Sequence, residues 1–508
     1  MYNMMKKIGI TMLAIGFIAC NGSKQNSTHE DQQIDSLEDY RPAYHFAPKN
    51  GWMNDPNGLV YLDGMYHLFF QHNPDAAIWG PMHWGHATST DLVHWEEQPI
   101  ALFPDSLGTI FSGSAVVDKD NTAGFGANAL VAIYTYHSHE IENQKTGLHQ
   151  TQGIAYSLDK GKTWNKYDGN PVLPNPGIWD FRDPKVMWHA ESSQWIMTLA
   201  TKQTITFYGS KNLKQWERLS EFGEGVGAHG GVWECPDLLR FSTPEGEKWV
   251  LLVSINPGGP NTGSATQYFV GDFDGKTFRT AQQDIRWMDY GPDNYAGVTF
   301  SNVGDRKILI AWMSNWEYAN VVPASSWRSG NTIVRELGLI REGDTWLLTS
   351  RPVEELDQVS EIKKDKKSVN LGDDVDRTAY MELANNTFDA SFILEKAVGF
   401  QVELANAGGD ILVFGYEPAE NRYFVDRSRA GEVSFSDKFI QRAVAPRLTQ
   451  KGTLSVRFLL DCNSIELFAD EGKTNMSALF FVKEPFTKMK VTTDEPASLK
   501  DLQVRVVR

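Results

Sequence analysis

Cysteine is scarce in this sequence of 508 residues, which contains only Cys20, Cys235 and Cys462. Three scattered thiols exclude a disulfide framework and a zinc ribbon, and we expect no redox chemistry. Basic residues are also in deficit, because 48 Lys and Arg stand against 64 Asp and Glu and give a formal net charge of −16. A negative field of this size repels nucleic acid and anionic lipid surfaces. The composition therefore indicates a neutral or cationic ligand and argues against nucleic-acid partners and a phosphate-rich substrate.

Long apolar runs are missing as well, apart from a short one near the start. This run extends from Ile8 to Ala19 behind two lysines, a length typical of a signal-peptide h-region and too short to span a bilayer. It ends in Phe17-Ile18-Ala19-Cys20, which resembles a bacterial lipobox except for Phe17. We interpret residues 1–20 as a signal peptide whose Cys20 becomes lipidated. An ordinary cleaved signal is the alternative.

Residues 21–39 are rich in Ser, Asn, Gln and acidic side chains and show no periodicity, which is typical of a flexible tether. Together with the signal, this segment predicts export from a bacterial cell, with a lipid anchor as the only attachment to a membrane. The expected location is the periplasm or the cell surface.

Tryptophan is plentiful, and its distribution divides the chain. All sixteen tryptophans lie between Trp52 and Trp346, and none occurs in the residues that follow. We therefore expect two different domains, one at residues 40–352 and one at residues 369–508. Residues 353–368 are polar and predict a partly helical linker between them.

An imperfect repeat runs through the first domain: an apolar strand, Ser with Asp or Asn, a short turn and an aromatic residue. Copies stand at residues 89–95, 157–164 and 210–216, with a weaker one at 272–278. They recur at intervals of roughly 50–70 residues, the length of a four-stranded blade. About 300 residues at about 60 each predict a five-bladed β-propeller. Short alternating strands such as 453–460 then predict a C-terminal β-sandwich, so the fold class is all-β.

Three short stretches carry a carboxylate among aromatic residues and prolines, which is unusual on a solvated surface. They are residues 52–58, 181–184 and 233–236. Each could be structural, because Asn-Asp-Pro-Asn-Gly is also a good turn and Arg182 could pair with Asp183. Their separation places them on different blades, whose inner strands converge on one end of the central channel. The three stretches together predict an acidic funnel there.

These stretches, with Phe111-Ser112-Gly113-Ser114, resemble the ordered signatures of glycoside hydrolase family 32, the β-fructofuranosidases. The resemblance extends over about residues 40–508. Within the family, residues 79–86, 181–184 and 311–316 look closest to secreted bacterial levanases, which remove fructose from chain ends.

The resemblance implies a retaining mechanism with two carboxyl groups of opposite protonation. Asp55 would be the nucleophile and Glu234 the acid/base, while Asp183 would stabilise the transition state by accepting hydrogen bonds from ring hydroxyls. It also implies a set of residues around the terminal fructose: Trp52, Asn54, Gln71, Trp79, Phe111, Ser112, Arg182 and Trp312. Asp289 and Asp293 are two further candidates, as acids at the rim of the site.

The function implied is an exo-β-fructosidase that releases terminal fructose from levan and also cleaves inulin and sucrose. The partners are then fructan polysaccharides or oligosaccharides and sucrose. An endo-acting levanase, a fructosyl transferase of the same family and a non-catalytic fructan-binding surface lipoprotein are the alternatives. Product analysis would separate the first two from hydrolysis at chain ends.

No cofactor is expected for this chemistry. The pairs His83/His86 and His137/His139 have the spacing of metal ligands, but we see no neighbouring carboxylate of ligand type, and the mechanism needs no metal. We therefore predict no metal site.

Overall fold

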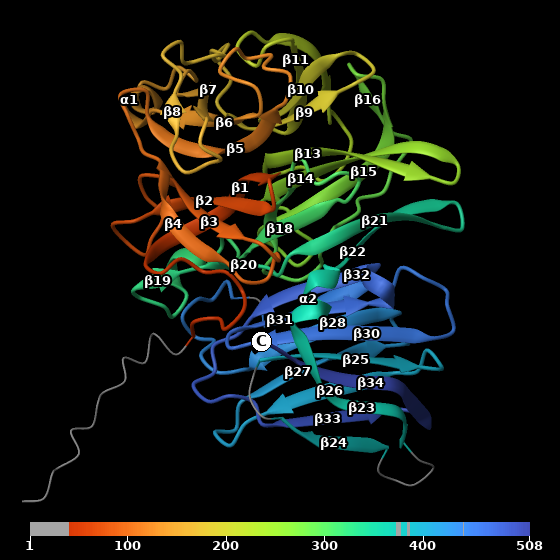
Figure 1. Cartoon of the computed structure of the whole chain (residues 1–508). Helices are drawn as coiled ribbons and strands as arrows, with labels where there is room; N and C mark the ends of the chain where they lie inside the picture. Colours follow the sequence, from red (N-terminus) through yellow and green to blue (C-terminus); the bar gives the residue numbers. More distant parts are fainter. Residues whose placement is uncertain (1–39, 372–376, 384–386, 440) are drawn as a thin grey trace, which may run out of the picture. The chain divides into compact units, whose positions relative to one another are not determined.

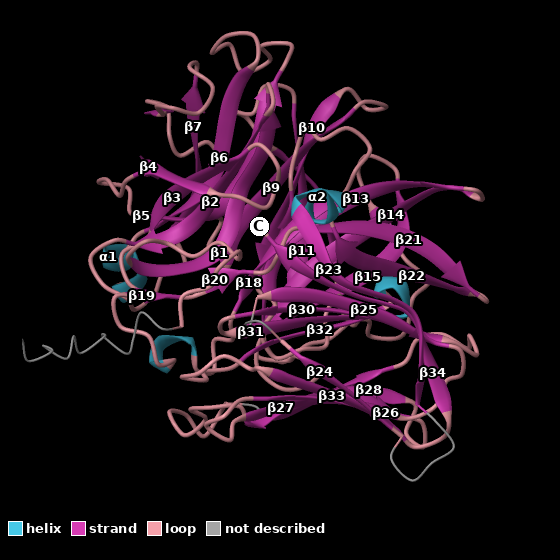
Figure 2. Cartoon of the chain, turned by 60° about the horizontal axis from the view of Figure 1, so that its bottom comes forward, coloured by secondary structure: helices cyan, strands magenta, loops and turns pink. Residues whose placement is uncertain are grey.

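The computed structural model describes residues 40–371, 377–383, 387–439 and 441–508. The expected signal peptide, Cys20 and the tether lie outside these ranges. Strands make up nearly all of the regular structure, as Figure 2 shows. In the described ranges the helices are α1 (His139–Asn143), α2 (Glu354–Val359), η1 (Ala319–Val321) and η2 (Asp470–Gly472). None of the helices in the described part of the chain is long and apolar enough to cross a membrane.

Five sheets follow one another along residues 51–352 and form the blades of a β-propeller, drawn from red to green in Figure 1. Blade 1 contains β1 (Gly51–Leu62), β2 (Met65–Asn73), β3 (His83–Ser89), β4 (Glu96–Leu102) and β19 (Trp327–Arg328); blade 2 contains β5 (Thr109–Asp118), β6 (Ala129–His137), β7 (Gln150–Ser157) and β8 (Asn165–Lys166); blade 3 contains β9 (Phe181–His189), β10 (Gln194–Thr201), β11 (Thr204–Ser210) and β12 (Glu217–Phe222). Blade 4 contains β13 (Val232–Thr243), β14 (Gly246–Asn256), β15 (Ala265–Phe273) and β16 (Phe278–Arg279), and blade 5 contains β17 (Tyr295–Thr299), β18 (Ile308–Met313), β20 (Gly330–Asn331), β21 (Arg335–Glu342) and β22 (Thr345–Pro352). The predicted five-bladed propeller is confirmed.

The first strand of each blade is the innermost, because β1, β5, β9, β13 and β17 contact one another in a closed ring. The segment after β18 returns to the first blade, where β19 pairs in parallel with β1 and closes the propeller. Equivalent positions of the five inner strands therefore meet at the same level of the central channel.

The sequence repeat forms the connection between the third and fourth strands of a blade. In blades 1 and 2 the repeated serine binds the turn: the Ser89 hydroxyl accepts from the Leu92 N–H at 2.8 Å, and the Ser157 hydroxyl accepts from the Gly161 N–H at 2.8 Å. The repeat is therefore a turn whose side chain satisfies a backbone donor.

Two six-stranded sheets pack face to face as a β-sandwich. One has the order β23 (Ser360–Leu371), β34 (Ala497–Val507), β25 (Phe388–Leu394), β30 (Leu454–Asp461), β31 (Ser464–Ala469) and β32 (Thr474–Leu479); the other has β24 (Thr378–Glu382), β33 (Lys488–Thr493), β26 (Phe400–Ala405), β27 (Ile411–Glu417), β28 (Arg422–Arg429) and β29 (Arg442–Pro446). Their inner faces share one apolar core, in which the rings of Phe414 and Phe458 from opposite sheets lie 4.7 Å apart. The predicted sandwich is confirmed.

Residues 353–368, expected as a linker, are largely part of the sandwich. Only α2 lies outside the sheets, and β23 starts at Ser360 and pairs along its length with β34. The lysines of this segment stand on an edge strand of the sandwich, where charged side chains oppose pairing with a second chain.

Asp289 and Asp293 are not rim acids, so that expectation is wrong. Both are buried, Asp289 at 2% exposure and Asp293 at 0%. Asp289 accepts from Arg335 at 2.8 Å and from the N–H of Ser477 in β32 at 2.9 Å. Asp293 accepts from the N–H of Leu479, also in β32, at 2.9 Å. The two acids join the propeller to the sandwich.

We predict that Arg335→Met destabilises the protein by about 3–5 kcal/mol, because it leaves the carboxylates of Asp289 and Glu466 buried without their shared cation. Arg341→Met is the matched control, since Arg341 forms an exposed pair with Glu245 and should change stability by less than about 0.5 kcal/mol. Denaturant unfolding measures both. Equal stability of the two variants would contradict the role assigned to the buried ion pairs of Arg335.

Candidate active site

A β-bulge interrupts each of the five inner strands near its start. The register shifts fall between Met53 and Pro56, Ile110 and Gly113, Arg182 and Lys185, Glu234 and Asp237, and Tyr295 and Val298. A regular strand points consecutive side chains to opposite faces, whereas a bulge turns them. Here consecutive pairs line one pocket: Asn54 with Asp55, Phe111 with Ser112, and Arg182 with Asp183. The bulges thus gather polar side chains at one level of the channel.

The backbone at these bulges is strained. Asp183, Cys235 and Ala296 adopt positive φ angles of 63°, 46° and 53°, in the left-handed region that residues with a Cβ rarely occupy. Prolines stand at three of the bulges: Pro184 and Pro236 lie inside them, and Pro56 is the first paired residue after the bulge of β1. Because proline has no N–H to donate to the sheet, it fits a strand best at such an interruption.

Asp55 is oriented by the neighbouring blades. Its Oδ1 accepts from the Asn54 amide at 3.0 Å and its Oδ2 from the Ser112 hydroxyl at 2.8 Å. Burial raises the pKa of Asp55 and the nearby Glu234 raises it further, while the two hydrogen bonds lower it. The carboxylate is therefore aimed into the pocket by donors on blades 1 and 2.

Glu234 is held at both oxygens. Arg182 donates to Oε1 through Nε at 3.0 Å and Nη2 at 2.9 Å, and the Tyr295 hydroxyl donates to Oε2. Arg182 in turn binds Asp180 at 2.7 Å. Burial lowers the pKa of Arg182, but Glu234 and the aspartates beside it hold that pKa above its ordinary value. The guanidinium stays charged, and Glu234 has a fixed direction.

Asp183 is the most deeply buried of the three acids, at 5% exposure. It accepts from the Cys235 N–H at 3.0 Å, and the Cys235 thiol lies 3.6 Å from both Asp183 and Asp55. Burial raises the pKa of Asp183 to about 7; Arg182 opposes this shift, and Glu234 and Asp55 add to it. Asp183 and Asp55 thus approach one sulfur atom from two blades.

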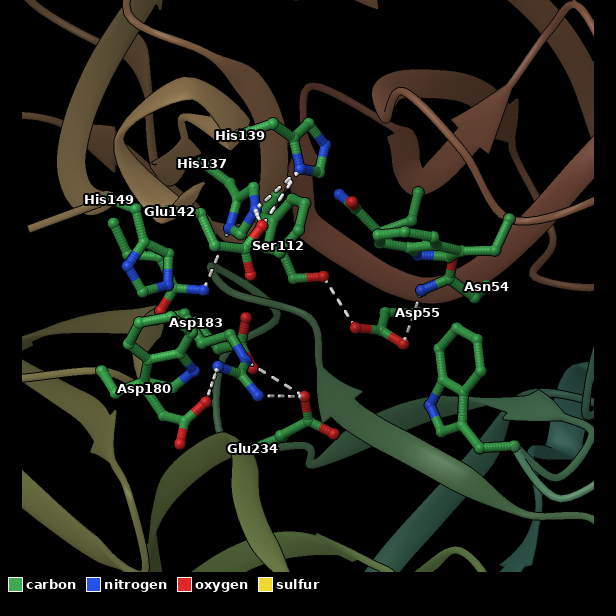
Figure 3. Close-up of a pocket in the computed structure, with 17 residues that line it drawn as sticks. Asn54, Asp55, Ser112, His137, His139, Glu142, His149, Asp180, Asp183 and Glu234 are labelled. Carbon is green, nitrogen blue, oxygen red and sulfur yellow. Dashed lines mark hydrogen bonds and ion pairs between the residues drawn. The ribbon is translucent and has the colours of Figure 1, made fainter. Parts of the chain in front are cut away.

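The three acids face a cavity of about 490 Å³, shown in Figure 3. Nine of the residues expected at the site line this cavity: Asn54, Asp55, Gln71, Trp79, Phe111, Ser112, Arg182, Asp183 and Glu234. The Gln71 Nε2 is buried and has no hydrogen-bond partner among the described residues. Such an unpaired donor at a pocket wall fits a polar ligand.

Trp52 and Trp312 lie behind the pocket wall instead of at its surface. Both are fully buried, and Trp52 donates to Asn54 at 2.7 Å. Their rings contact Trp316, which does line the cavity. The two tryptophans therefore support Asn54 and Trp316. The sequence interpretation missed Trp316 although it included the stretch 311–316.

The sequence interpretation also missed one whole wall of the cavity, formed by His137, His139, Glu142, His149, Gln150, Trp179 and Asp180. The statement that His137 and His139 have no carboxylate nearby is wrong. Glu142, on the helix α1, lies 3.2 Å from His137 Nε2 and 3.3 Å from His139 Nδ1. The signal that could have revealed it is its position three residues after His139, one helical turn away.

These three side chains could hold a metal ion, since their ligand atoms lie close together. The hydrogen bonds of Gln150 oppose this. Its Oε1 accepts from the Phe181 N–H at 2.7 Å, so its Nε2 must donate to His137 Nδ1. A neutral His137 then carries its proton on Nε2 and offers no lone pair to a metal there. Burial lowers the pKa of His137 to about 4, which keeps it neutral. We infer that Nε2 donates to Glu142 and braces α1.

The second histidine pair is separated. His86 Nε2 lies 3.1 Å from His67 Nδ1 inside blade 1, and His83 Nδ1 faces the carbonyl of Pro81. The H-x-x-H spacing of His83 and His86 thus reflects two unrelated positions on β3.

Two family models together match nearly all of the described chain. The model of the glycosyl hydrolases family 32 N-terminal domain matches residues 45–352, and that of the family 32 C-terminal domain matches residues 352–506. The chain belongs to glycosyl hydrolase family 32.

Individual relatives agree with this family. The chain is 46% identical over 455 residues to the levanase of Bacillus subtilis, an alignment that covers 86% of this chain and 65% of the levanase. It is 39% identical over 482 residues to the extracellular exo-inulinase of Aspergillus ficuum, covering 87% and 89% of the two chains. The crystal structure of the exo-inulinase from Aspergillus awamori superposes with a TM-score of 0.83 at 35% identity, covering 92% of this chain and 98% of that one.

For this family 32 protein we predict that Asp183→Asn is more stable than the wild type at pH 8, by roughly 1–2 kcal/mol. The pKa of Asp183 is about 7 in the folded protein and near 4 when unfolded, so its ionisation costs stability above pH 7. That cost, and with it the advantage of the variant, should vanish as the pH falls towards 4. Thermal unfolding at several pH values measures it.

The control is Asp63→Asn, because the Asp63 side chain is 57% exposed and should change stability little at any pH. A variant of Asp183 that is less stable than the wild type at pH 8 would contradict the burial argument.

Proposed function

We propose that the protein is a retaining glycoside hydrolase that releases terminal fructose from β-fructans, acting on levan and also on inulin and sucrose. The observation that carries the proposal is the position of Asp55, Glu234 and Asp183 in one pocket of a family 32 propeller. The relatives named levanase and exo-inulinase support the substrate class.

In the first step Asp55 attacks the anomeric carbon of the terminal fructose, and the bond to the leaving oxygen breaks as Glu234 gives its proton to that oxygen. The hydrogen bonds from Asn54 and Ser112 support the role of Asp55, because they fix the carboxylate in one orientation. In the second step Glu234 takes a proton from water, the water oxygen attacks the anomeric carbon, and the bond from that carbon to Asp55 breaks, which frees fructose and the Asp55 carboxylate.

Glu234 alternates between acid and carboxylate, and its partners suit this cycle. Arg182 and Tyr295 donate to its two oxygens, so they stabilise the carboxylate that remains after the proton has left. Asp183 transfers no proton in this scheme. It accepts hydrogen bonds from ring hydroxyls, and these strengthen as positive charge develops on the sugar.

Incubation with levan, inulin and sucrose tests the proposal. We predict free fructose as the early product from levan, because the relatives of this chain include exo-inulinases. A ladder of oligosaccharides without free fructose would establish endo action, new fructosides at high sucrose would establish transfer, and no product would favour a fructan-binding protein.

The matched controls are Asp55→Ala and Glu234→Ala, which should each lower kcat by about three orders of magnitude or more. Near-normal turnover in either variant would contradict the assigned roles.

We also propose that the mature chain is anchored by lipid at Cys20, on the outside of a bacterial cell or in its periplasm. The apolar run Ile8 to Ala19, the lipobox-like residues before Cys20 and the polar segment 21–39 support this.

Cys20→Ala should move the protein from the membrane fraction to the soluble fraction with activity intact, because Cys20 lies far in sequence from the inner strands. Fractionation and an activity assay measure this. If the variant stays with the membranes, or if the wild type is already soluble, the proposal of a lipid anchor is wrong. Plain secretion would then be the better interpretation of the signal peptide.

A further inference from the structure

One side of the pocket is lined by residues that are neither the three acids nor their hydrogen-bond partners. Two connections of the propeller build the additional side: residues 138–149, which join β6 to β7 and include α1, and residues 167–180, which precede β9. The two connections touch each other. A Cβ on Gly147, whose φ is +77°, would lie 2.8 Å from the carbonyl oxygen of Gly177, so this approach requires glycine.

Aromatic rings line this side in a continuous row. Trp79 lies 6.3 Å from Phe111, Phe111 stacks on His137 at 4.3 Å, His137 lies 5.2 Å from His149, and His149 lies 4.5 Å from Trp179, all between ring centroids. The row runs from blade 1 across blade 2 to the connection before blade 3. Aromatic faces of this kind cover the apolar side of a sugar ring.

The position of Glu234 indicates which sugar of the substrate this side of the pocket would contact. Figure 3 shows Asp180, His149 and Glu142 on one side of the pocket and Asn54 on the other, with Asp55 and Glu234 between them. Arg182 links Glu234 to Asp180. An acid must reach the leaving oxygen, and Arg182 joins Glu234 to the side of the pocket that carries Asp180, so the sugar beyond the cleaved bond would lie on that side.

His149 has the character of a binding residue. It is 3% exposed and lines the cavity, yet its Nδ1 has no hydrogen-bond partner among the described residues. A buried nitrogen without a partner costs free energy unless a ligand meets it. Burial lowers the pKa of His149, so the ring is neutral and suits a sugar hydroxyl. Trp179 is half-buried beside it and carries Lys145 at 5.5 Å from its ring.

We propose that Trp179 and His149 form a subsite for the fructosyl unit next to the cleaved bond, with Trp179 as the stacking surface and His149 Nδ1 as the hydrogen-bonding atom. This inference rests on the proposed function, since it identifies the leaving group of that reaction. The subsite makes a fructosyl chain a better substrate than a fructoside with a small leaving group.

Two substrates separate the subsite from the chemistry: a β-2,6-linked difructose and β-fructofuranosyl fluoride, which has no second sugar. In Trp179→Ala the ratio of kcat/KM for the difructose to kcat/KM for the fluoride should fall about tenfold. His149→Phe keeps the ring contacts and removes the nitrogens, and it should lower the same ratio about threefold to tenfold. Trp179→Phe should restore most of the ratio.

Trp188→Ala is the matched control, because Trp188 is a comparably accessible tryptophan, 39% exposed, elsewhere on blade 3. Its ratio should equal that of the wild type, and unfolding midpoints identify any variant that is destabilised. An unchanged ratio in folded Trp179→Ala and His149→Phe would overturn the subsite. A wild type that fails to hydrolyse the fluoride would instead overturn the proposed function.

Discussion

The ring of β-bulges in the inner strands is the constraint on which the site depends. A strand alternates its side chains between two faces, so a regular β1 or β9 could offer the pocket only every second residue. With a bulge, Asn54 and Asp55 face the same cavity, and so do Arg182 and Asp183. The strained φ angles at three bulges cost about 1–3 kcal/mol each. The blades offset this cost because each inner strand is packed between two others.

The charges of the site depend on the same geometry. Three carboxyl groups on three blades converge at one pocket, and burial is the largest cause that raises the pKa of Asp55 and Asp183. Arg182 binds Glu234 and lowers the pKa of Asp183, and the Cys235 N–H at the bulge of β13 donates to Asp183 directly. The bulges therefore supply both the acids and the donors that make their burial tolerable, which ties the electrostatics to the backbone conformation.

The three acids on the inner strands, which form the floor of the site, could be predicted from the sequence. The wall formed by the connections 138–149 and 167–180 could not. Asp55, Asp183 and Glu234 stand in short motifs whose prolines mark the bulges, so local sequence carries their positions. Trp179, His149 and Glu142 come from connections whose place depends on how blades 2 and 3 pack. Trp52 and Trp312 are of a residue type that often contacts sugars. They are nevertheless buried, because they lie behind the pocket wall, where their rings contact Trp316. Asp289 and Asp293 bind β32, which lies more than 180 residues further along the chain.

This division between floor and wall has a mechanistic consequence. The inner strands are fixed on both sides by neighbouring strands, so the relative positions of Asp55 and Glu234 cannot change without disturbing the ring that closes the propeller. The connections 138–149 and 167–180 are held to the strands by individual hydrogen bonds, such as the one between Glu142 and His137 and the one from Asn170 to the carbonyl of Ile154. Loops held by a rigid scaffold can vary while the scaffold stays the same. The proposed chemistry therefore depends on residues of the inner strands, and the proposed choice of leaving group depends on residues of two connections.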